Sequence, residues 1–81
     1  MVYVYKVLDE EKDELISVCD RQFLYNFLQE HCQLNDIKFE TQLTPSNDGK
    51  YLIYRGENKD VYEIIETIKG VRKILYTLLI C

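Results

Sequence analysis

The sequence predicts a small α+β domain in which an antiparallel sheet carries two helices on one of its faces. Apolar residues recur with helical spacing over residues 20–33 and again over 60–69. Residues 37–44 instead alternate apolar and polar side chains, which is typical of a half-buried strand. Residues 71–80 form a long run without glycine or proline that suits a central strand. The length of 81 residues fits one domain, which we expect to span residues 1–81.

The first half of the chain predicts a strand, a charged turn and a helix. Residues 2–8 are rich in valine and tyrosine and read as a strand. Residues 9–14 hold five acids and one lysine, which is typical of a solvated turn. Residues 15–19 are poor in helix formers, so we favour a return strand over a longer helix that begins here. Asp20 is expected to cap the helix over 20–33. Its inward stripe is predicted to be Phe23, Leu24, Phe27, Leu28 and Cys32.

The second half predicts a hairpin, a second helix and the long strand. The strand at 37–44 meets the turn sequence Pro-Ser-Asn-Asp-Gly at 45–49, and residues 51–55 return as its partner. For the helix over 60–69, the spacing of a capping box marks the start and Gly70 offers a left-handed C-terminal residue. The capping box is Asp60 with Glu63, and the apolar stripe is Val61, Ile64, Ile65 and Ile68.

In chain order, the expected elements are strand, strand, helix, strand, strand, helix, strand. Without the second strand, this is the βαββαβ order of ferredoxin-like folds. We therefore expect a ferredoxin-like arrangement, with an extra N-terminal hairpin strand as the open alternative. The match is one of topology alone, because no signature motif of a named family occurs in the chain.

The composition argues against catalysis and against metal or cofactor binding. Phosphate-binding loops, zinc-protease motifs and nucleophile-elbow motifs are absent. Cys19, Cys32 and Cys81 lack the paired spacing of structural zinc sites and are expected to be free thiols. The sequence places no serine, cysteine or aspartate where it could work with His31, so His31 is not expected to act as a catalytic base. Neither a membrane-length apolar run nor a signal peptide is evident, so we expect a cytoplasmic protein.

Charge offers two candidate surfaces on a chain of net charge −4. Acidic residues cluster in the predicted turn and would suit a partner with a basic surface. A more specific hypothesis is that this acidic surface mimics DNA. Cations cluster near the junction with the last strand, where Tyr54 or Tyr76 would provide a stacking platform for single-stranded nucleic acid. The net negative charge disfavours nucleic acid. The acidic surface is Asp9, Glu10, Glu11, Asp13 and Glu14, and the basic patch is Lys69, Arg72 and Lys73.

The seven tyrosines indicate a contact surface. Two helices cover only one face of a sheet, so the other face would expose tyrosines and aliphatic side chains over a larger area than a monomer normally leaves bare. The alternative is that these tyrosines face solvent and only favour strand formation, without forming an interface. The expected partner-binding residues are Tyr3, Tyr5, Tyr51, Ile74, Tyr76 and Leu78.

From these features we expect a non-catalytic protein–protein interaction module, either a homodimer or a small acidic adaptor or inhibitor. The absence of alanine beside many AT-coded residues indicates a low-GC genome such as that of a Firmicute, an archaeon or a bacteriophage, so a phage-encoded viral protein is one expectation. The alternative function is a small-molecule-binding regulatory domain that acts as a homodimer, by analogy of fold alone. Single-stranded nucleic-acid binding is the third.

Overall fold

The computed structural model describes residues 3–34, 48–56 and 60–81, which form a five-stranded antiparallel sheet and one α-helix. The strand predicted at 37–44 lies outside these residues. The elements are β1 (Tyr5–Leu8), β2 (Glu14–Val18), α1 (Arg21–Cys32), β3 (Gly49–Tyr54), β4 (Val61–Ile68) and β5 (Val71–Ile80).

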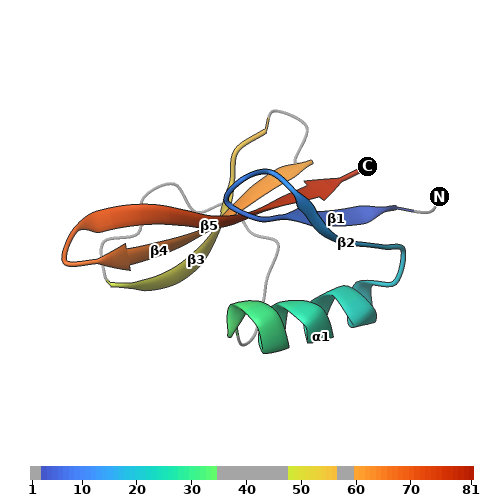
Figure 1. Cartoon of the computed structure of the whole chain (residues 1–81), viewed down its shortest axis with the longest axis horizontal. Helices are drawn as coiled ribbons and strands as arrows, with labels where there is room; N and C mark the ends of the chain where they lie inside the picture. Colours follow the sequence, from blue (N-terminus) through green and yellow to red (C-terminus); the bar gives the residue numbers. More distant parts are fainter. Residues whose placement is uncertain (1–2, 35–47, 57–59) are drawn as a thin grey trace.

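The long strand β5 lies at the centre of the sheet, whose order is β2-β1-β5-β4-β3 (Figure 1). Its C-terminal half pairs with β1 on one side, and nearly its whole length pairs with β4 on the other. The central position predicted for residues 71–80 is therefore confirmed. The return strand favoured over residues 15–19 is also confirmed, because β2 pairs antiparallel with β1.

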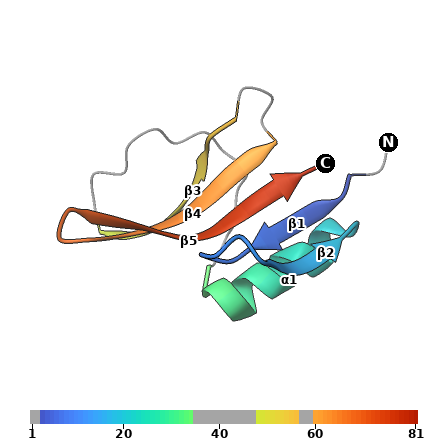
Figure 2. The ribbon, with the colours of Figure 1, turned by 45° about the horizontal axis from the view of Figure 1, so that its top comes forward.

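Helix α1 packs on one face of the sheet, beside β1 and β2 (Figure 2). Asp20 caps it as predicted: its Oδ1 accepts a hydrogen bond from the Gln22 backbone N–H at 2.9 Å. Phe23 was predicted to point inward and instead is 55% exposed. The buried face of α1 consists of Leu24, Leu28 and Cys32.

The described residues include no helix with the length and apolarity that a membrane crossing needs.

Residues 61–68 form strand β4, and the helix predicted there is wrong. β4 is paired with β3 on one side and β5 on the other. Both of its faces are buried: Tyr62 and Ile64 face α1, while Ile65 and Thr67 face the opposite side. A strand with two dry faces carries apolar residues at neighbouring positions, which reproduces helical spacing by chance. Within the described residues, the structure has one helix, and the ferredoxin-like order is not found.

The junction between β4 and β5 is a two-residue hairpin turn. Lys69 and Gly70 have φ values of 51° and 80°, and positive φ at both central residues is what a type I′ turn requires. Gly70 is therefore a turn residue and does not end a helix. The Asp48 carboxylate accepts a hydrogen bond from the Lys69 backbone N–H at 3.0 Å. The hairpin formed by β4 and β5 extends beyond the part of the sheet that α1 covers (Figure 1).

Replacing Lys69 with asparagine is expected to stabilise the protein by about 0.5 kcal/mol, because asparagine tolerates positive φ better than lysine. The measurement is the midpoint of urea unfolding. Lys73→Asn is the matched control: it makes the same exchange within β5, where the backbone is extended, and is expected to give no gain. Equal effects of the two substitutions would contradict the turn assignment.

The sheet face opposite α1 is buried at its centre, although Ile74 on the same face is 44% exposed. Ile53 of β3 and Ile65 of β4 point to this face, and each is only 1% exposed. Because the structure contains a single chain, the protein itself provides this burial. The centre of this face, at β3 and β4, is therefore covered within the chain, and the interface predicted for it stays a prediction.

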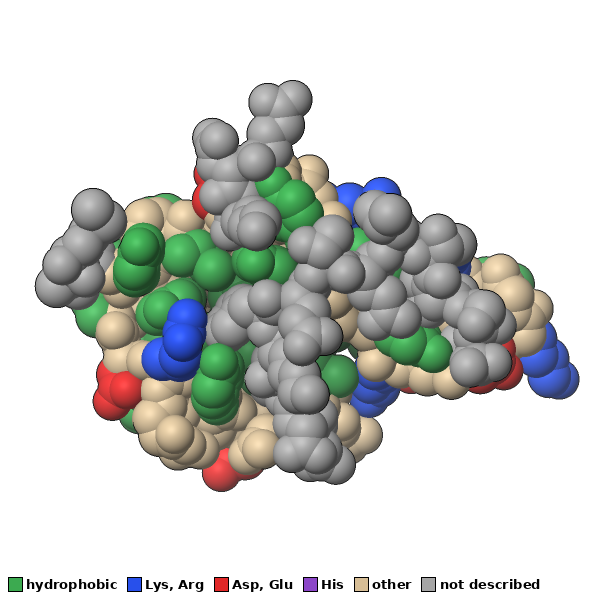
Figure 3. Space-filling view, turned by 180° about the vertical axis from the view of Figure 1, so that it is seen from behind, with side chains coloured by type: hydrophobic (Ala, Val, Ile, Leu, Met, Phe, Trp, Pro, Cys, Tyr) green, Lys and Arg blue, Asp and Glu red, His purple; other side chains and the backbone are tan. Residues whose placement is uncertain are grey.

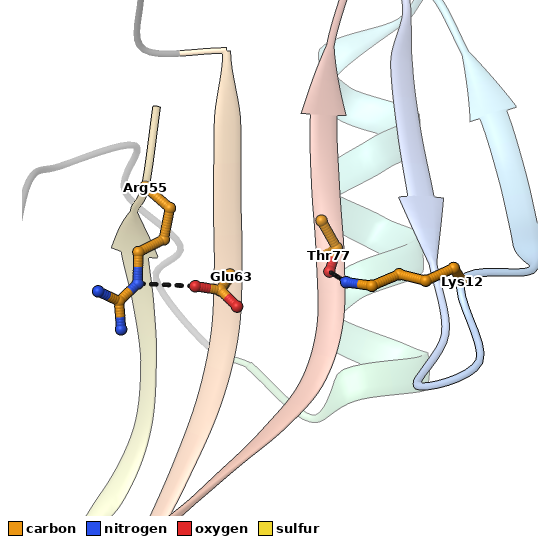
Figure 4. A network of polar contacts seen from close by, with 4 residues as sticks. All are labelled: Lys12, Arg55, Glu63 and Thr77. Atoms are coloured by element: carbon orange, nitrogen blue, oxygen red, sulfur yellow. Dashed lines mark hydrogen bonds and ion pairs between the residues drawn. The ribbon is translucent and has the colours of Figure 1, made fainter. Parts of the chain in front are cut away.

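Polar side chains on this second face are paired across strands (Figure 4). Arg55 Nε lies 2.7 Å from Glu63 Oε1, and Glu63 is mostly buried. Lys12 reaches from the β1–β2 turn and donates from Nζ to Thr77 Oγ1 at 2.9 Å. These contacts tie β3 to β4 and the acidic turn to β5.

Candidate functional site

A pocket of about 440 Å³ lies between the β1–β2 turn, the C-terminal end of α1 and the strands β3 and β5. Its volume falls in the range of small-molecule sites. One wall is acidic and comes from the turn, while the floor combines aliphatic and aromatic side chains with one cation. The lining residues are Asp9, Glu10, Glu11, His31, Cys32, Lys50, Leu75 and Tyr76.

The acidic wall is held by the geometry of the turn. Asp9 Oδ1 accepts hydrogen bonds from the backbone N–H groups of Glu11 and Asp13, each at 2.9 Å. Glu10 forms an ion pair with Lys73 at 3.2 Å, and both side chains are more than half exposed. Such an exposed pair contributes little stability, so its main effect is to place Glu10 beside β5. Among the described residues, the Glu11 carboxylate has no ion-pair partner.

The floor of the pocket depends on an irregularity in β5. Ile64 pairs with Tyr76 but Ile65 pairs with Ile74, so Leu75 is an extra residue in β5. This β-bulge places Leu75 beside Tyr76 in the lining of the pocket. No local sequence signal marks the bulge, which explains why the pocket was not predicted.

The thiol at the base of the pocket is not activated. Burial raises the pKa of Cys32 to about 11, and the nearby charge of Lys50 and a hydrogen bond with Tyr76 only partly offset this effect. Burial also raises the pKa of Tyr76. Lys50 Nζ donates to the Cys32 backbone oxygen at 3.3 Å, so it caps the end of α1. His31 is exposed and stacks on Phe27. A protonated, buried thiol is a poor nucleophile.

Two of the three thiols are expected to react with a disulfide reagent in the native protein at pH 8. Cys19 and Cys81 are exposed, whereas Cys32 is buried and stays protonated well above that pH. Counting the released chromophore before and after adding denaturant measures this directly. The third thiol should appear only after unfolding, and the Cys32→Val variant should show two thiols in both states. Rapid reaction of all three in the native protein would contradict the assignment.

The end of the β4–β5 hairpin is the second unusual surface. Val71 is 71% exposed, and Ile68 and Ile74 are each more than two-fifths exposed. We call residues 66–74 the hairpin tip. Lys69 and Arg72 are also exposed there, and Lys and Arg side chains project from this end of the molecule (Figure 3). Ile68 and Val71 share one face of the hairpin, and Ile74, which pairs with Ile65, lies on the other face. The tip therefore exposes aliphatic side chains on both faces, and clustered exposed apolar side chains are typical of interaction sites.

The hairpin tip is positively charged on an acidic protein. It holds Lys69, Arg72 and Lys73 against Glu66, which gives 3 − 1 = +2. Since the whole chain carries −4, all other residues together carry −6. The predicted basic patch is therefore brought together at one exposed end of the sheet.

The structure does not bring the predicted partner-binding residues together on one surface. Tyr5 and Leu78 are buried in the core, so a partner could not contact them. Tyr3 and Ile74 are exposed, whereas Tyr51 and Tyr76 are half-buried.

Two other predicted groups are only partly assembled. Of the acidic residues, the turn brings Asp9, Glu10 and Glu11 to the pocket, and Asp13 and Glu14 are exposed outside its lining. Tyr54 and Tyr76, the stacking partners considered for nucleic acid, pack against the core. That arrangement leaves the basic patch without those two aromatic side chains.

No family model, curated protein or solved structure matches this chain. Among the described residues, no group of histidine, cysteine and acidic side chains is arranged to hold a metal ion. The pocket and the hairpin tip are the two surface features that bear on function.

The edge of the sheet at β2 is less available than its position suggests. Val7 pairs with Ile16 but Leu8 pairs with Glu14, so Leu15 is an extra residue in β2. A bulge of this kind twists an edge strand and discourages pairing with another chain. Only a short regular stretch of β2 remains for pairing with another chain.

Proposed function

We propose that this protein is a non-catalytic protein–protein interaction module that binds through its hairpin tip. The observation that carries the proposal is the exposure of Val71, Ile68 and Ile74 at the end of a hairpin that projects past α1. Burying aliphatic surface is the main source of affinity in most protein interfaces, and cations at the rim select the partner. The sheet-face interface expected from the sequence is replaced here by a hairpin end.

Several features support binding over catalysis. The buried thiol of the pocket has a pKa that burial raises to about 11, so no thiolate is available as a nucleophile near neutral pH, and His31 stacks on Phe27. The tip is held in shape before any partner arrives, since its turn is bound by Asp48 and its strands are paired. Preorganisation lowers the entropic cost of association. All three cysteines are free, as in a reducing compartment, so we place this interaction in the cytoplasm.

The test is affinity capture from cells that naturally contain the protein, combined with sedimentation of the purified protein to detect self-association. Val71→Glu places a charge in the centre of the tip and is expected to abolish binding. Phe23→Glu makes the same change at an exposed position on α1 and is expected to have no effect. If Val71→Glu leaves both the captured proteins and the self-association unchanged, the proposal fails.

A second candidate function, regulation by a small molecule, is favoured by the pocket. Its volume of about 440 Å³ and its mixture of acids, one lysine and apolar side chains suit a small ligand with a positive group. The test is a thermal-shift panel of cationic metabolites on the wild type and on Tyr76→Ala. A stabilising metabolite whose effect is lost in the variant supports this function, and an unresponsive wild type removes it.

A further inference from the structure

The hairpin tip and the pocket lie on the same side of the hairpin, a short distance apart. Lys50, Glu66 and Lys73 form one cross-strand row, and Lys50 lines the pocket. Ile68 and Val71 form the next row on that face, because side chains two residues apart share a face. Val71 lies five residues from Tyr76 of the pocket, roughly 15 Å along a strand.

The two surfaces are complementary in charge and in polarity. The tip carries a net charge of +2, although its Lys73 is already paired with Glu10 of the pocket in the same molecule. The acidic wall of the pocket includes Glu11, whose carboxylate has no ion-pair partner within the described part of the chain. Lys69, at the apex of the turn, is exposed and makes no ion pair within the described residues. Behind the apex, Ile68 and Val71 match the apolar lining that Leu75 provides. The tip of one molecule therefore fits the pocket of another.

We propose that two copies of this chain associate about a two-fold axis, and that each inserts Lys69 and the flanking Ile68–Val71 pair into the acidic pocket of the other. This proposal rests on the proposed function and names the partner as a second copy. Both surfaces lie on one face, so a single two-fold axis satisfies both contacts and closes the assembly.

The charges disfavour the simpler arrangement in which two tips pack against each other. That arrangement would bring two surfaces of net charge +2 into contact. Packing through the β2 edges is opposed by the bulge at Leu15. Of these arrangements, the reciprocal insertion is the one that covers Val71 and pairs Lys69 with acids.

A charge-exchange experiment tests the proposal. Lys69→Glu and Glu11→Lys are both exposed substitutions, and each alone places like charges in both contacts of the dimer. Each is expected to weaken dimerisation by about tenfold or more in sedimentation across a concentration series. An equimolar mixture of the two variants should restore the dimer, because the mixed dimer holds one native contact and one contact with both charges exchanged. Circular dichroism verifies that each variant is folded.

Three results would overturn the proposal. The first is a wild-type protein that is monomeric throughout the series. The second is a dimer weakened by Lys69→Glu but not by Glu11→Lys, which would place the tip on another surface. The third is a mixture that fails to recover. In each case the proposed function survives if Val71→Glu still releases a captured protein, so the two failures are distinguishable.

Discussion

Replacing Tyr62 with alanine is expected to lower the free energy of unfolding by about 3 kcal/mol. Tyr62 is 5% exposed and packs with Tyr54 and the core beneath the sheet. Truncation removes a large aromatic side chain from a site that cannot fully collapse, which costs both burial and packing. A domain of this length has about 4 to 12 kcal/mol of stability in total, so the loss is a large fraction.

The neighbouring substitution makes this a test of β4 itself. In the helix predicted from sequence, Val61 belongs to the inward apolar stripe and Tyr62 is outside that stripe. In strand β4, Tyr62 is the buried residue and Val61 is only partly buried. Val61→Ala is therefore expected to cost about 1 kcal/mol. Urea unfolding of both variants provides the measurement. A larger loss for Val61→Ala than for Tyr62→Ala would support a helix and contradict the strand.

Replacing Leu28 with alanine is expected to cost about 3 kcal/mol, because this side chain is fully buried between α1 and the sheet. Phe23 on the same helix loses far more atoms when truncated, yet Phe23→Ala is expected to cost less than about 1 kcal/mol because the ring is 55% exposed. Thermal or urea unfolding of the two variants compares them directly. If the phenylalanine variant is the less stable one, α1 is rotated relative to the orientation described here.

Much of the fold could be predicted because its signals are local. Asp20 before the apolar stripe of α1 is a cap whose chemistry acts within one turn, and it caps the helix as expected. The run of β-branched and aromatic residues over 71–80, with no glycine or proline, is also a local signal, and these residues form the central strand β5.

The failures share a cause in tertiary structure. Ile64 and Ile65 have the spacing of a helical stripe, but they are buried on opposite faces of a strand that lies between two others. A pattern of this kind cannot distinguish a helix from a strand with two dry faces. Phe23 was assigned inward because the stripe is wide, and the position of α1 relative to β2 then decided which edge of the stripe was exposed.

The candidate site was even less predictable from the sequence. The basic patch was recognised, but its place at a hairpin tip followed from the strand identity of β4. The pocket forms only because the bulge at Leu75 lies beside the β1–β2 turn, which is more than sixty residues away in the sequence. Contacts such as the ion pair between Glu10 and Lys73 hold the turn against β5. Such contacts depend on the final packing, so composition and spacing do not reveal them.

The central claim is that the hairpin tip is the surface that becomes covered when this protein associates. Methyl NMR with a soluble paramagnetic chelate measures the coverage of Ile68, Val71 and Ile74 directly, with Ile53 and Ile65 as buried references. We expect the chelate to broaden the three tip signals in dilute protein and to lose that effect when the protein is concentrated or its partner is added, while the references stay sharp throughout. Tip signals that remain equally broadened after association, with other methyl groups becoming protected instead, would contradict the claim.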